Sequence, residues 1–511
     1  MSHPPKIVLI DRFKHNHRVL PREIAIARHR RPSACTGTCF AHSVDGHGPV
    51  AAHAPAGSIL SLWSARVRHS SAYLCAVILC GVVSSAYAQE PKAPPPAAKP
   101  PVPNRLNDVM PTWLRVRGEF RERVEGFDNS GFNAARDDMY YLSRFRFNAA
   151  TTSKYVGTTV QLQDARVGKK TVGSTAAPFK APFDLRMAFA DVGTAKSKVI
   201  ARVGRQELTF GDQRLVGHAG WLNAARTFDA AKVTIKSAAM QLDVFGASVV
   251  RILDGEFDKS GSGNRFAGAY ATSGKVIPKG SVEPYVFFRR DVNQRAETGV
   301  PGSLRQVTTG ARFAGRAAAG LDYNVEMDMQ SGSLGADDVK AWAGHWQLRE
   351  AIPGKMAPHV TGEYNFASGD ENPADGTRGT FDQLYATAHD KYGLSDQVGW
   401  RNIHDIRLGF DVSPFKATPI TVNYHSYWLA ERRDALYAAS GAVLARVPAG
   451  AASTKVGQEI DVQVTRPLSP QLALAAGYSH LFAGPFLKQA TPGRSYTGPF
   501  VMLTYVFLAE K

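Results

Sequence analysis

Charged and apolar residues alternate in the segment that starts at Trp113. One parity of this segment is fully charged and consists of Arg115, Arg117, Glu119, Arg121 and Arg123. A guanidinium group can pair with a carboxylate through two parallel hydrogen bonds, so a row of arginines attracts anions. An acid within the row competes for the arginines and limits how long an anion stays bound. The chemistry expected here is weak, repeated binding of anions.

A β-strand would place these charges on one face, because alternate residues of a strand point to opposite sides. The other parity of the segment is mainly apolar, and the pattern recurs in 140–150, where Arg144 and Arg146 oppose Phe145 and Phe147. A strand with one charged face and one apolar face needs water on one side and lipid on the other. A transmembrane β-barrel with a polar lumen supplies both.

The same alternation occurs in eighteen segments, an even number, as closed single-chain bacterial barrels require. The segments lie near 113–123, 140–150, 157–166, 183–193, 198–208, 228–237, 239–250, 266–272, 283–290, 305–317, 320–330, 339–350, 357–367, 403–412, 418–429, 456–466, 470–482 and 497–508. In the fourth, Asp184 and Arg186 oppose Phe183, Leu185, Met187 and Phe189. The predicted fold class is all-β, a transmembrane antiparallel β-barrel of about 18 strands.

A soluble β-sandwich also alternates, because it buries one face of each sheet. It rarely carries so many ionic residues in mid-strand, and a signal for export precedes the strands here. Tyr73–Val83 is an apolar run of signal-peptide length, preceded by Arg66 and Arg68 and followed by Ala-Tyr-Ala ending at Ala88. Cleavage is expected after Ala88. A membrane anchor is the alternative, but the run is too short to span a bilayer.

The chain accordingly divides into three parts. Residues 1–88 form a leader with the signal peptide, and 1–65, rich in His, Arg and Pro, fit a start assigned too far upstream, with an unusually long n-region of the signal as the alternative. Residues 89–111 form a Pro/Ala-rich linker, expected to be extended in the periplasm. Residues 112–511 form the barrel, so the expected location is the outer membrane of a Gram-negative cell.

Charge and cysteine content exclude some classes of function. The leader holds ten of the 61 basic and three of the 44 acidic residues, which leaves an excess of about ten positive charges on the remaining chain. The excess is spread along the chain, without the basic block of a nucleic-acid-binding arm. All four cysteines precede residue 88, so disulfides and thiolate metal sites are excluded beyond it. We expect no metal and no cofactor.

Several sequence blocks resemble the alginate export family. They are 202–208 (RVGRQEL) with 211–214 (GDQR), Trp221 and 226–229 (RTFD); 381–385 (FDQLY) with His389, Gly393, Asp396 and 400–402 (WRN); and 434–437 (DALY), 459–461 (EID) and 477–480 (GYSH). The resemblance spans about 112 to 508. It implies an outer-membrane barrel of 18 strands, in agreement with the strand count, and an electropositive lumen that passes a polyuronate such as alginate outward.

The candidate site residues are charged side chains expected to face the lumen. The first set of arginines is Arg115, Arg117, Arg121, Arg123, Arg144 and Arg146, and the second is Arg186, Arg205, Arg214, Arg226, Arg312 and Arg316. The lumen acids are Glu119, Asp184, Asp322, Glu326 and Asp328. The alternative is that these arginines only neutralise the acids and brace a filled interior. Arg205 shares its parity with Ala201 and Val203, so it needs a bulge or a loop position to reach the lumen.

Two long connections interrupt the strand pattern, at 368–402 and 430–455. Loops of this length are usually functional or mobile, and we expect one of them to fold into the lumen or to cap it. Asp370, Glu371, Asn372 and Asp375 could hold Ca²⁺, although their spacing matches no known loop and a solvated loop is the alternative.

The predicted function is an outer-membrane channel for anionic polysaccharide or related anions, and a diffusion porin, either general or for small organic anions, is the alternative. The chain is expected to be a monomer, with a periplasmic secretion scaffold as a candidate partner and no nucleic-acid partner. An enzyme is not expected. His425-Ser426 and His389-Asp390 are neighbours whose side chains would point to opposite faces of a strand, and no G-x-S-x-G, H-E-x-x-H or phosphate-binding motif occurs.

Overall fold

The computed structural model describes residues 105–296 and 299–508, which all belong to one unit of the fold, Pro94–Lys511. The expected leader, its cleavage site and residues 89–104 of the expected linker lie outside the described residues. The last part of that linker is not wholly extended, because Arg105–Val109 forms a short helix, α2. Asn107 of α2 exchanges two hydrogen bonds with the backbone of Val116, which fastens the helix to the first strand.

Eighteen antiparallel strands form the wall of the barrel. They are β1 (Leu114–Phe127), β2 (Asp138–Thr152), β3 (Val156–Gly168), β4 (Ala181–Val192), β5 (Val199–Gln206), β6 (Phe228–Lys236), β7 (Gln241–Arg251), β8 (Lys259–Thr272), β9 (Gly280–Arg295), β10 (Pro301–Ala318), β11 (Leu321–Leu334), β12 (Asp337–Ala351), β13 (His359–Ala367), β15 (Ile403–Phe415), β16 (Thr418–Leu429), β19 (Lys455–Pro467), β20 (Leu472–Ala483) and β21 (Tyr496–Phe507). Each overlaps one predicted segment, so the predicted fold class is confirmed.

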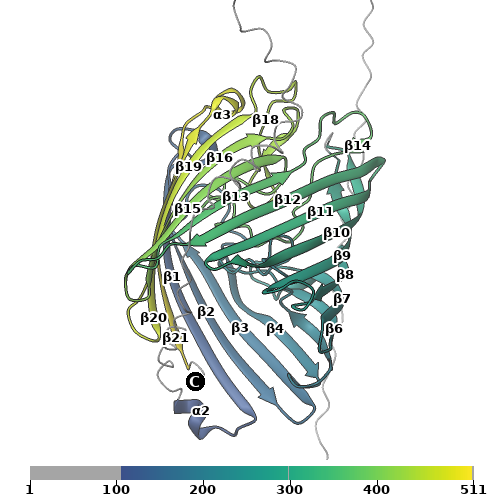
Figure 1. Ribbon diagram of the computed structural model, residues 1–511, viewed down its shortest axis with the longest axis vertical. Coiled ribbons are helices and arrows are strands. Elements are labelled where there is room, and N and C mark those ends of the chain that lie inside the picture. The colour runs from purple at the N-terminus through teal and green to yellow at the C-terminus, as the bar shows by residue number, and fades with distance from the viewer. Residues whose placement is uncertain (1–104, 297–298, 509–511) are drawn as a thin grey trace, which may run out of the picture. The chain divides into compact units, whose positions relative to one another are not determined.

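The wall closes because β21 pairs with β1, from Gly118 opposite Phe507 to Glu125 opposite Phe500. Every other wall strand pairs with the next one along the chain, as Figure 1 shows. Closure leaves no unpaired strand edge, which is the condition for a sheet to cross a membrane. The remaining short strands belong to loops: β14 (Thr377–Arg378) lies parallel to β12, and β17 (Ala435–Tyr437) pairs with β18 (Val443–Arg446).

The connections at the two ends of the barrel differ in length. At the end where α2 lies, β2 and β3 are joined by three residues, 153–155, and β15 and β16 by two, 416–417. The opposite end carries loop A (207–227, between β5 and β6), loop B (368–402, between β13 and β15) and loop C (430–454, between β16 and β19). Short turns face the periplasm and long loops face outward in barrels of this kind.

Side chains alternate across the wall as the sequence predicts. Phe120 and Val124 of β1 point outward and are 43% and 46% exposed, whereas Arg121 and Arg123 point inward and are 4% and 3% exposed. The described helices, α2, the 3-10 helix η2 (Ser130–Phe132) and α3 (Pro485–Ala490), are all too short to cross a membrane.

The β4 strand is one of those that depart from simple alternation. The register between β3 and β4 shifts so that Gln161 opposes Met187 and Leu162 opposes Leu185, which leaves Arg186 as an extra residue in a β-bulge. A bulge changes the parity of the residues that follow it. Asp184 and Arg186 keep the predicted inward face. Met187 and Phe189, predicted to oppose them, lie on the inward face as well, opposite Gln161 and Thr159.

Candidate functional site in the barrel lumen

Loop A spans the interior from the β7–β9 wall to the β1–β2 wall. At its first end, Phe210 stacks on Phe245 of β7 and Tyr270 of β8, with ring centroids 5.3 and 5.0 Å apart. Leu215 and Val216 belong to the same buried cluster. The stretch between the predicted strands 198–208 and 228–237 was not singled out as a long connection. Because loop A runs inward, it narrows the lumen, and it is the first part of the candidate site.

Three of the predicted lumen arginines hold the other end of loop A. Arg121 donates hydrogen bonds to the carbonyl oxygens of Gly220 and Trp221 at 3.1 and 3.0 Å. Arg144 donates to those of Gly220 and Leu222 at 3.0 and 3.1 Å. Arg123 donates to the Trp221 carbonyl at 2.7 Å, and its guanidinium lies 3.8 Å from the centre of the indole ring. These three side chains therefore position a loop and are almost fully buried by it.

Loop B also folds into the barrel. Its Asp382 forms an ion pair with Arg289 of β9. The Asp382 backbone exchanges two hydrogen bonds with the Gln330 side chain of β11. On the other side, Ser395 donates two hydrogen bonds to Glu459 of β19, at 2.9 and 2.7 Å. Since Arg289, Gln330 and Glu459 line the inner wall, loop B bridges the lumen.

Loops A and B contact each other directly. Val216 and Tyr385 form a parallel β-bridge, and Arg226 donates to the carbonyls of Gly217 and Ala386 at 3.1 and 3.2 Å. The imidazole of His389 stacks on Trp221 with ring centroids 3.9 Å apart and planes 5° from parallel. Predicted lumen residue Arg226 is thus a loop-to-loop connector.

Loop C packs against loop B from the β17–β18 hairpin. Asp434 accepts hydrogen bonds from the Thr380 hydroxyl at 2.6 Å and the Asp370 amide at 3.1 Å. The Gly399 amide donates to the Tyr437 carbonyl at 2.8 Å. One of the two long loops was expected to fold into the lumen or to cap it; loop B enters the lumen, and loop C rests on loop B.

A basic cluster lies where loop A meets the β1–β4 wall. Arg144 pairs with Glu119 at 2.6 Å, and Arg186 pairs with Glu207 of loop A. Arg146 donates through Nε to Gln163 at 2.8 Å, and its Nη2 is buried without a hydrogen-bond partner within residues 105–296 and 299–508. Arg117 points into the same side of the lumen and is exposed. Arginines outnumber the acids in this cluster.

The positive charge of the cluster shifts the pKa values of two loop A residues, Glu207 and His218. Burial alone would raise the pKa of Glu207, yet Arg186 and the other cationic groups bring that pKa below its ordinary value. Burial lowers the pKa of His218, and Arg186, Arg146 and Arg144 lower it further against the opposing effect of Glu207. Both shifts result from positive charge around these residues, which stabilises an anion at this place and destabilises an additional cation.

The other predicted arginines lie elsewhere in the interior or outside it. Arg214 of loop A is buried and pairs with Glu363 at 3.1 Å and Asp212 at 3.2 Å. Arg312 pairs with Glu283 at 2.9 Å. At the short-turn end, Arg316 pairs with Asp322 at 2.9 Å, both more than 40% exposed, and Arg115 donates to the carbonyls of Pro111 and Leu114. Each of these residues has a local partner.

Arg205 does not turn toward the lumen. It opposes Asp229 in the β5–β6 register and shares its face with Val203, which is 61% exposed. Its guanidinium pairs with Asp229 at 2.8 Å and donates to two backbone carbonyls. The bulge that Arg205 needed occurs on β4 and leaves the parity of β5 unchanged.

The predicted lumen acids gather mostly on the wall away from the basic cluster. Glu326 and Asp328 of β11 both accept hydrogen bonds from the hydroxyl of Tyr285, the first at 2.6 Å. Asp184 of β4 instead accepts from the Asp258 amide at 2.6 Å. The lumen therefore has a basic side at β1–β4 and an acidic side at β9–β11.

Sequence reasoning missed several charged pairs of the interior. Arg289 supports loop B, Arg407 of β15 pairs with Glu363, and His425 of β16 pairs with Asp405 at 2.9 Å. Alternation alone could have placed Arg407 and Asp405 on one face. Arg289 gave no such signal, since Arg290 follows it and alternation could not tell which arginine faces inward.

The carboxylates of the acidic stretch of loop B take part in turns and do not converge on one point. Asp370 accepts from the Asn372 amide at 2.9 Å and Asp375 from the Thr377 amide at 2.7 Å, as turn-forming aspartates do. Nowhere in residues 105–296 and 299–508 do three or more His, Cys, Asp or Glu side chains come together as metal ligands.

Comparisons with known proteins agree with this architecture. The sequence model of the family described as "Alginate export" matches residues 112–498. OpdO of Pseudomonas aeruginosa has a similar structure, with 14% identity and a TM-score of 0.53 over 78% of this chain and 99% of that one. The outer membrane protein OpdK of the same organism gives 12% and 0.53 over 77% and 98%. OccAB4 of Acinetobacter baumannii gives 11% and 0.52 over 77% and 98%. No curated protein matches the chain.

Proposed function

The chain belongs to the alginate export family, and from this premise we propose that its lumen passes an anionic polysaccharide of the uronate type, or related anions, across the outer membrane. The family consists of transport channels and not of enzymes, and the chain is an outer-membrane β-barrel. We further propose that the chain acts as a monomer after removal of the leader near Ala88, and that a periplasmic scaffold delivers the polymer to it.

The basic cluster at β1–β4 supports this proposal most strongly. Arg121, Arg144, Arg146 and Arg186 gather on one wall, where Glu119 pairs with Arg144 and Glu207 pairs with Arg186. Carboxylates passing along this wall would be attracted by the positive charge of these groups in a lumen narrowed by loops, where electrostatic attraction is stronger than in bulk water.

The arginines would have two different roles in such a channel. Arg121, Arg123 and Arg144 fix loop A and so set the width of the path. Arg117 is exposed and Arg146 is half-buried, so these two side chains can contact a passing carboxylate. Acids nearby prevent tight trapping, because conduction needs sites from which the solute can leave.

A porin for small organic anions is the second candidate. It is favoured by the three loops at the outer end, two of which bridge the lumen and bury bulky side chains such as Trp400 and Phe381 there. A narrow path suits a monomeric anion, whereas a polymer needs a continuous passage or a movement of loops A and B.

Block of single channels in planar bilayers distinguishes the two candidates. Oligouronates of increasing length are added to one side, with neutral oligosaccharides of equal length as the matched control. We expect transient block that lengthens with oligouronate length and is absent with the neutral sugars. Equal block by uronate monomer and oligomer would establish the small-anion porin instead, and indifference to both would contradict passage of uronates.

A further inference from the structure

Three arginines lie side by side on the outer surface of the barrel. Arg265 of β8 opposes Arg290 of β9, and Arg290 opposes Arg305 of β10. All three are exposed and share the outward face with Phe288 and Val307, each two residues away on its strand. Adjacent strands lie about 4.8 Å apart, so the three guanidinium groups form a row of about 10 Å. We call this row the outer arginine row.

The outer arginine row has no internal charge compensation. Within residues 105–296 and 299–508, none of the three guanidinium groups takes part in an ion pair or hydrogen bond. Asp229, the one carboxylate that lines the adjoining hollow, is paired with Arg205. Like charges directly opposite each other destabilise a sheet, so the row carries a cost that a bound anion would remove.

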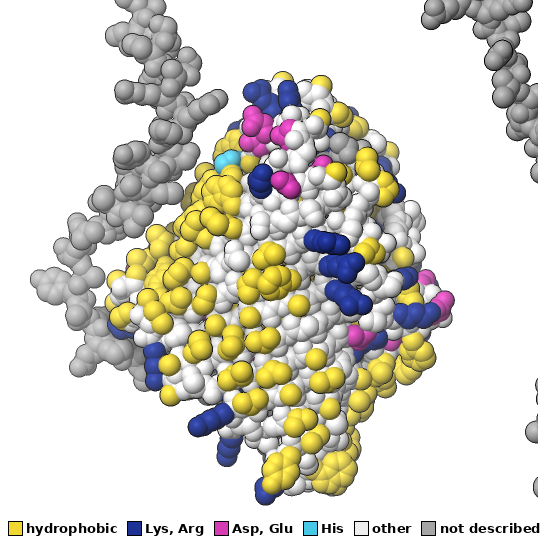
Figure 2. Space-filling model, turned by 90° about the vertical axis from the view of Figure 1, so that its right-hand side faces the viewer, with side chains coloured by type: hydrophobic (Ala, Val, Ile, Leu, Met, Phe, Trp, Pro, Cys, Tyr) yellow, Lys and Arg dark blue, Asp and Glu magenta, His cyan; other side chains and the backbone are white. Residues whose placement is uncertain are grey.

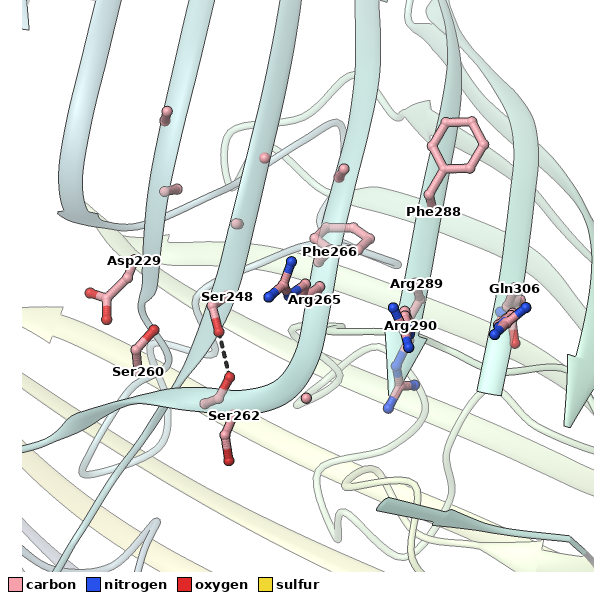
Figure 3. A pocket seen from close by; sticks show the side chains of 18 of the residues that line it. Asp229, Ser248, Ser260, Ser262, Arg265, Phe266, Phe288, Arg289, Arg290 and Gln306 are labelled. Atoms are coloured by element: carbon pink, nitrogen blue, oxygen red, sulfur yellow. Dashed lines mark hydrogen bonds between the residues drawn. The ribbon is translucent and has the colours of Figure 1, made fainter. Parts of the chain in front are cut away.

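An amphipathic hollow of about 1350 Å³ adjoins the row. Its outward-facing floor is apolar or small, with Val203, Ala231, Gly246, Ala267 and Phe288 among its lining residues. Its polar rim includes Ser260 and Ser262, and Ser248, whose hydroxyl donates to the Gly261 carbonyl at 2.6 Å. Figure 3 shows Arg265 and Arg290 on neighbouring strands beside the serines, with Phe288 farther along β9.

The row lies at the boundary between the apolar belt and the outer end of the barrel. On β9 the outward residues Val282, Pro284, Val286 and Phe288 precede Arg290. The strand runs from the short-turn end toward the end that carries loops A, B and C. Figure 2, which faces this side, shows a short row of Lys and Arg side chains beside a broad field of hydrophobic ones. This is the level of the headgroups in the outer leaflet.

We propose that the outer arginine row and its hollow bind a phosphorylated, multiply acylated glycolipid of the outer leaflet. The phosphates pair with Arg265, Arg290 and Arg305, since guanidinium groups bind phosphate oxygens bidentately. The acyl chains lie along the apolar floor, and the serines contact the sugar. This site is independent of the cargo that passes through the lumen.

Binding of diphosphorylated lipid A to the delipidated full-length protein tests the proposal, measured by native mass spectrometry in detergent. The variant Arg265→Gln/Arg290→Gln/Arg305→Gln removes the row. The matched control Lys154→Gln/Lys416→Gln/Arg466→Gln removes three exposed charges near the short-turn end. We expect wild type and control to bind one lipid A, and the row variant to bind at least about tenfold more weakly.

Two comparisons on the wild type make the test independent of the variants' folding. Dephosphorylated lipid A is expected to bind at least about tenfold more weakly than the diphosphorylated form. Phosphatidylglycerol is expected to bind wild type and row variant equally. Equal binding of both lipid A forms, or of lipid A to wild type and row variant, would overturn the proposal. A loss of phosphatidylglycerol binding equal to that of lipid A would show a general anionic-lipid surface and overturn it as well.

Discussion

Five arginines of β1 and β2 inside the barrel fall into two kinds, those that hold a loop and those that are open to the lumen. Arg121, Arg123 and Arg144 donate hydrogen bonds to backbone carbonyls of loop A. Arg117 is exposed and Arg146 is half-buried, so both are open to the lumen. The sequence placed all five on one face but could not separate the two kinds, because the separation depends on a loop nearly 100 residues away.

Charge reversal at the second kind is expected to change ion selectivity. Arg117→Glu with Arg146→Gln removes three units of positive charge from the lumen, so the reversal potential in a salt gradient shifts toward that of a cation-selective channel. Arg466→Glu with Lys416→Gln removes the same charge from exposed positions near the periplasmic turns and is expected to leave selectivity nearly unchanged. Equal shifts in both variants would contradict the assignment of Arg117 and Arg146.

Removal of the first kind is expected to change the loop instead. Arg121→Gln with Arg144→Gln deletes charge-assisted hydrogen bonds, each worth about 1.5–3 kcal/mol, that dock residues 220–222. Amide exchange in 217–224 is expected to accelerate, and single-channel current is expected to become larger and noisier. Unchanged exchange in a correctly folded variant would show that these arginines do not hold the loop.

Loops A and B together form the element that positions the site. Loop A contacts an aromatic wall through Phe210 and contacts arginines of β1 and β2 through residues 220–222. Loop B crosses from β9 and β11 to β19. Strand alternation predicted the wall that supports these loops. It could not predict their inward path, which long-range aromatic packing and buried hydrogen bonds determine. The bulge at Arg186 was equally invisible to alternation, so the faces of Met187 and Phe189 were predicted wrongly.

The contact between the two loops is expected to depend on pH. Burial lowers the pKa of His389, but the Asp396 carboxylate, 3.0 Å away, outweighs burial and raises it above the ordinary value; Asp390 adds to the rise and Arg123 opposes it. Because the pKa is raised, protonated His389 stabilises the contact between the loops. This stabilisation is complete below about pH 6.5 and is lost as pH rises through the folded-state pKa of His389.

Conductance should therefore increase as pH is raised from about 6 to 9, as the Trp221–His389 contact loosens. His389→Gln is expected to flatten this part of the pH profile. His359→Gln, at the short-turn end of β13, serves as the control and should preserve the profile. A wild-type profile that is flat over this range would count against the proposed coupling.

At the scale of the whole molecule, closure of eighteen strands gives both the membrane-spanning wall and the enclosed lumen. This level was the most predictable from sequence, because period-2 alternation is repeated in every strand and the even count agrees with closure. Family membership connects the fold to transport, whereas the nature of the cargo depends on side chains that the fold does not determine.

Closure also imposes a local backbone requirement at Gly204 on β5. Its φ is 125°, and a Cβ there would lie 2.2 Å from the Ala188 carbonyl oxygen on β4. Gly204→Val should lower the free energy of unfolding by at least about 1–3 kcal/mol through backbone strain, measured by urea denaturation in detergent. Gly362→Ala on β13, where a Cβ would have open space, is the control and should change stability little. Equal stability of both variants would refute the requirement.

The sign of the reversal potential of the wild-type channel under a KCl gradient is the most direct test of the central claim, that the β1–β4 wall makes the lumen attractive to anions. The account predicts a potential displaced toward the chloride equilibrium value, and a larger displacement at low ionic strength, where charges are less screened. A potential displaced toward the potassium value would show that the acidic wall at β9–β11 dominates the path, and would contradict passage of a polyanion through this lumen.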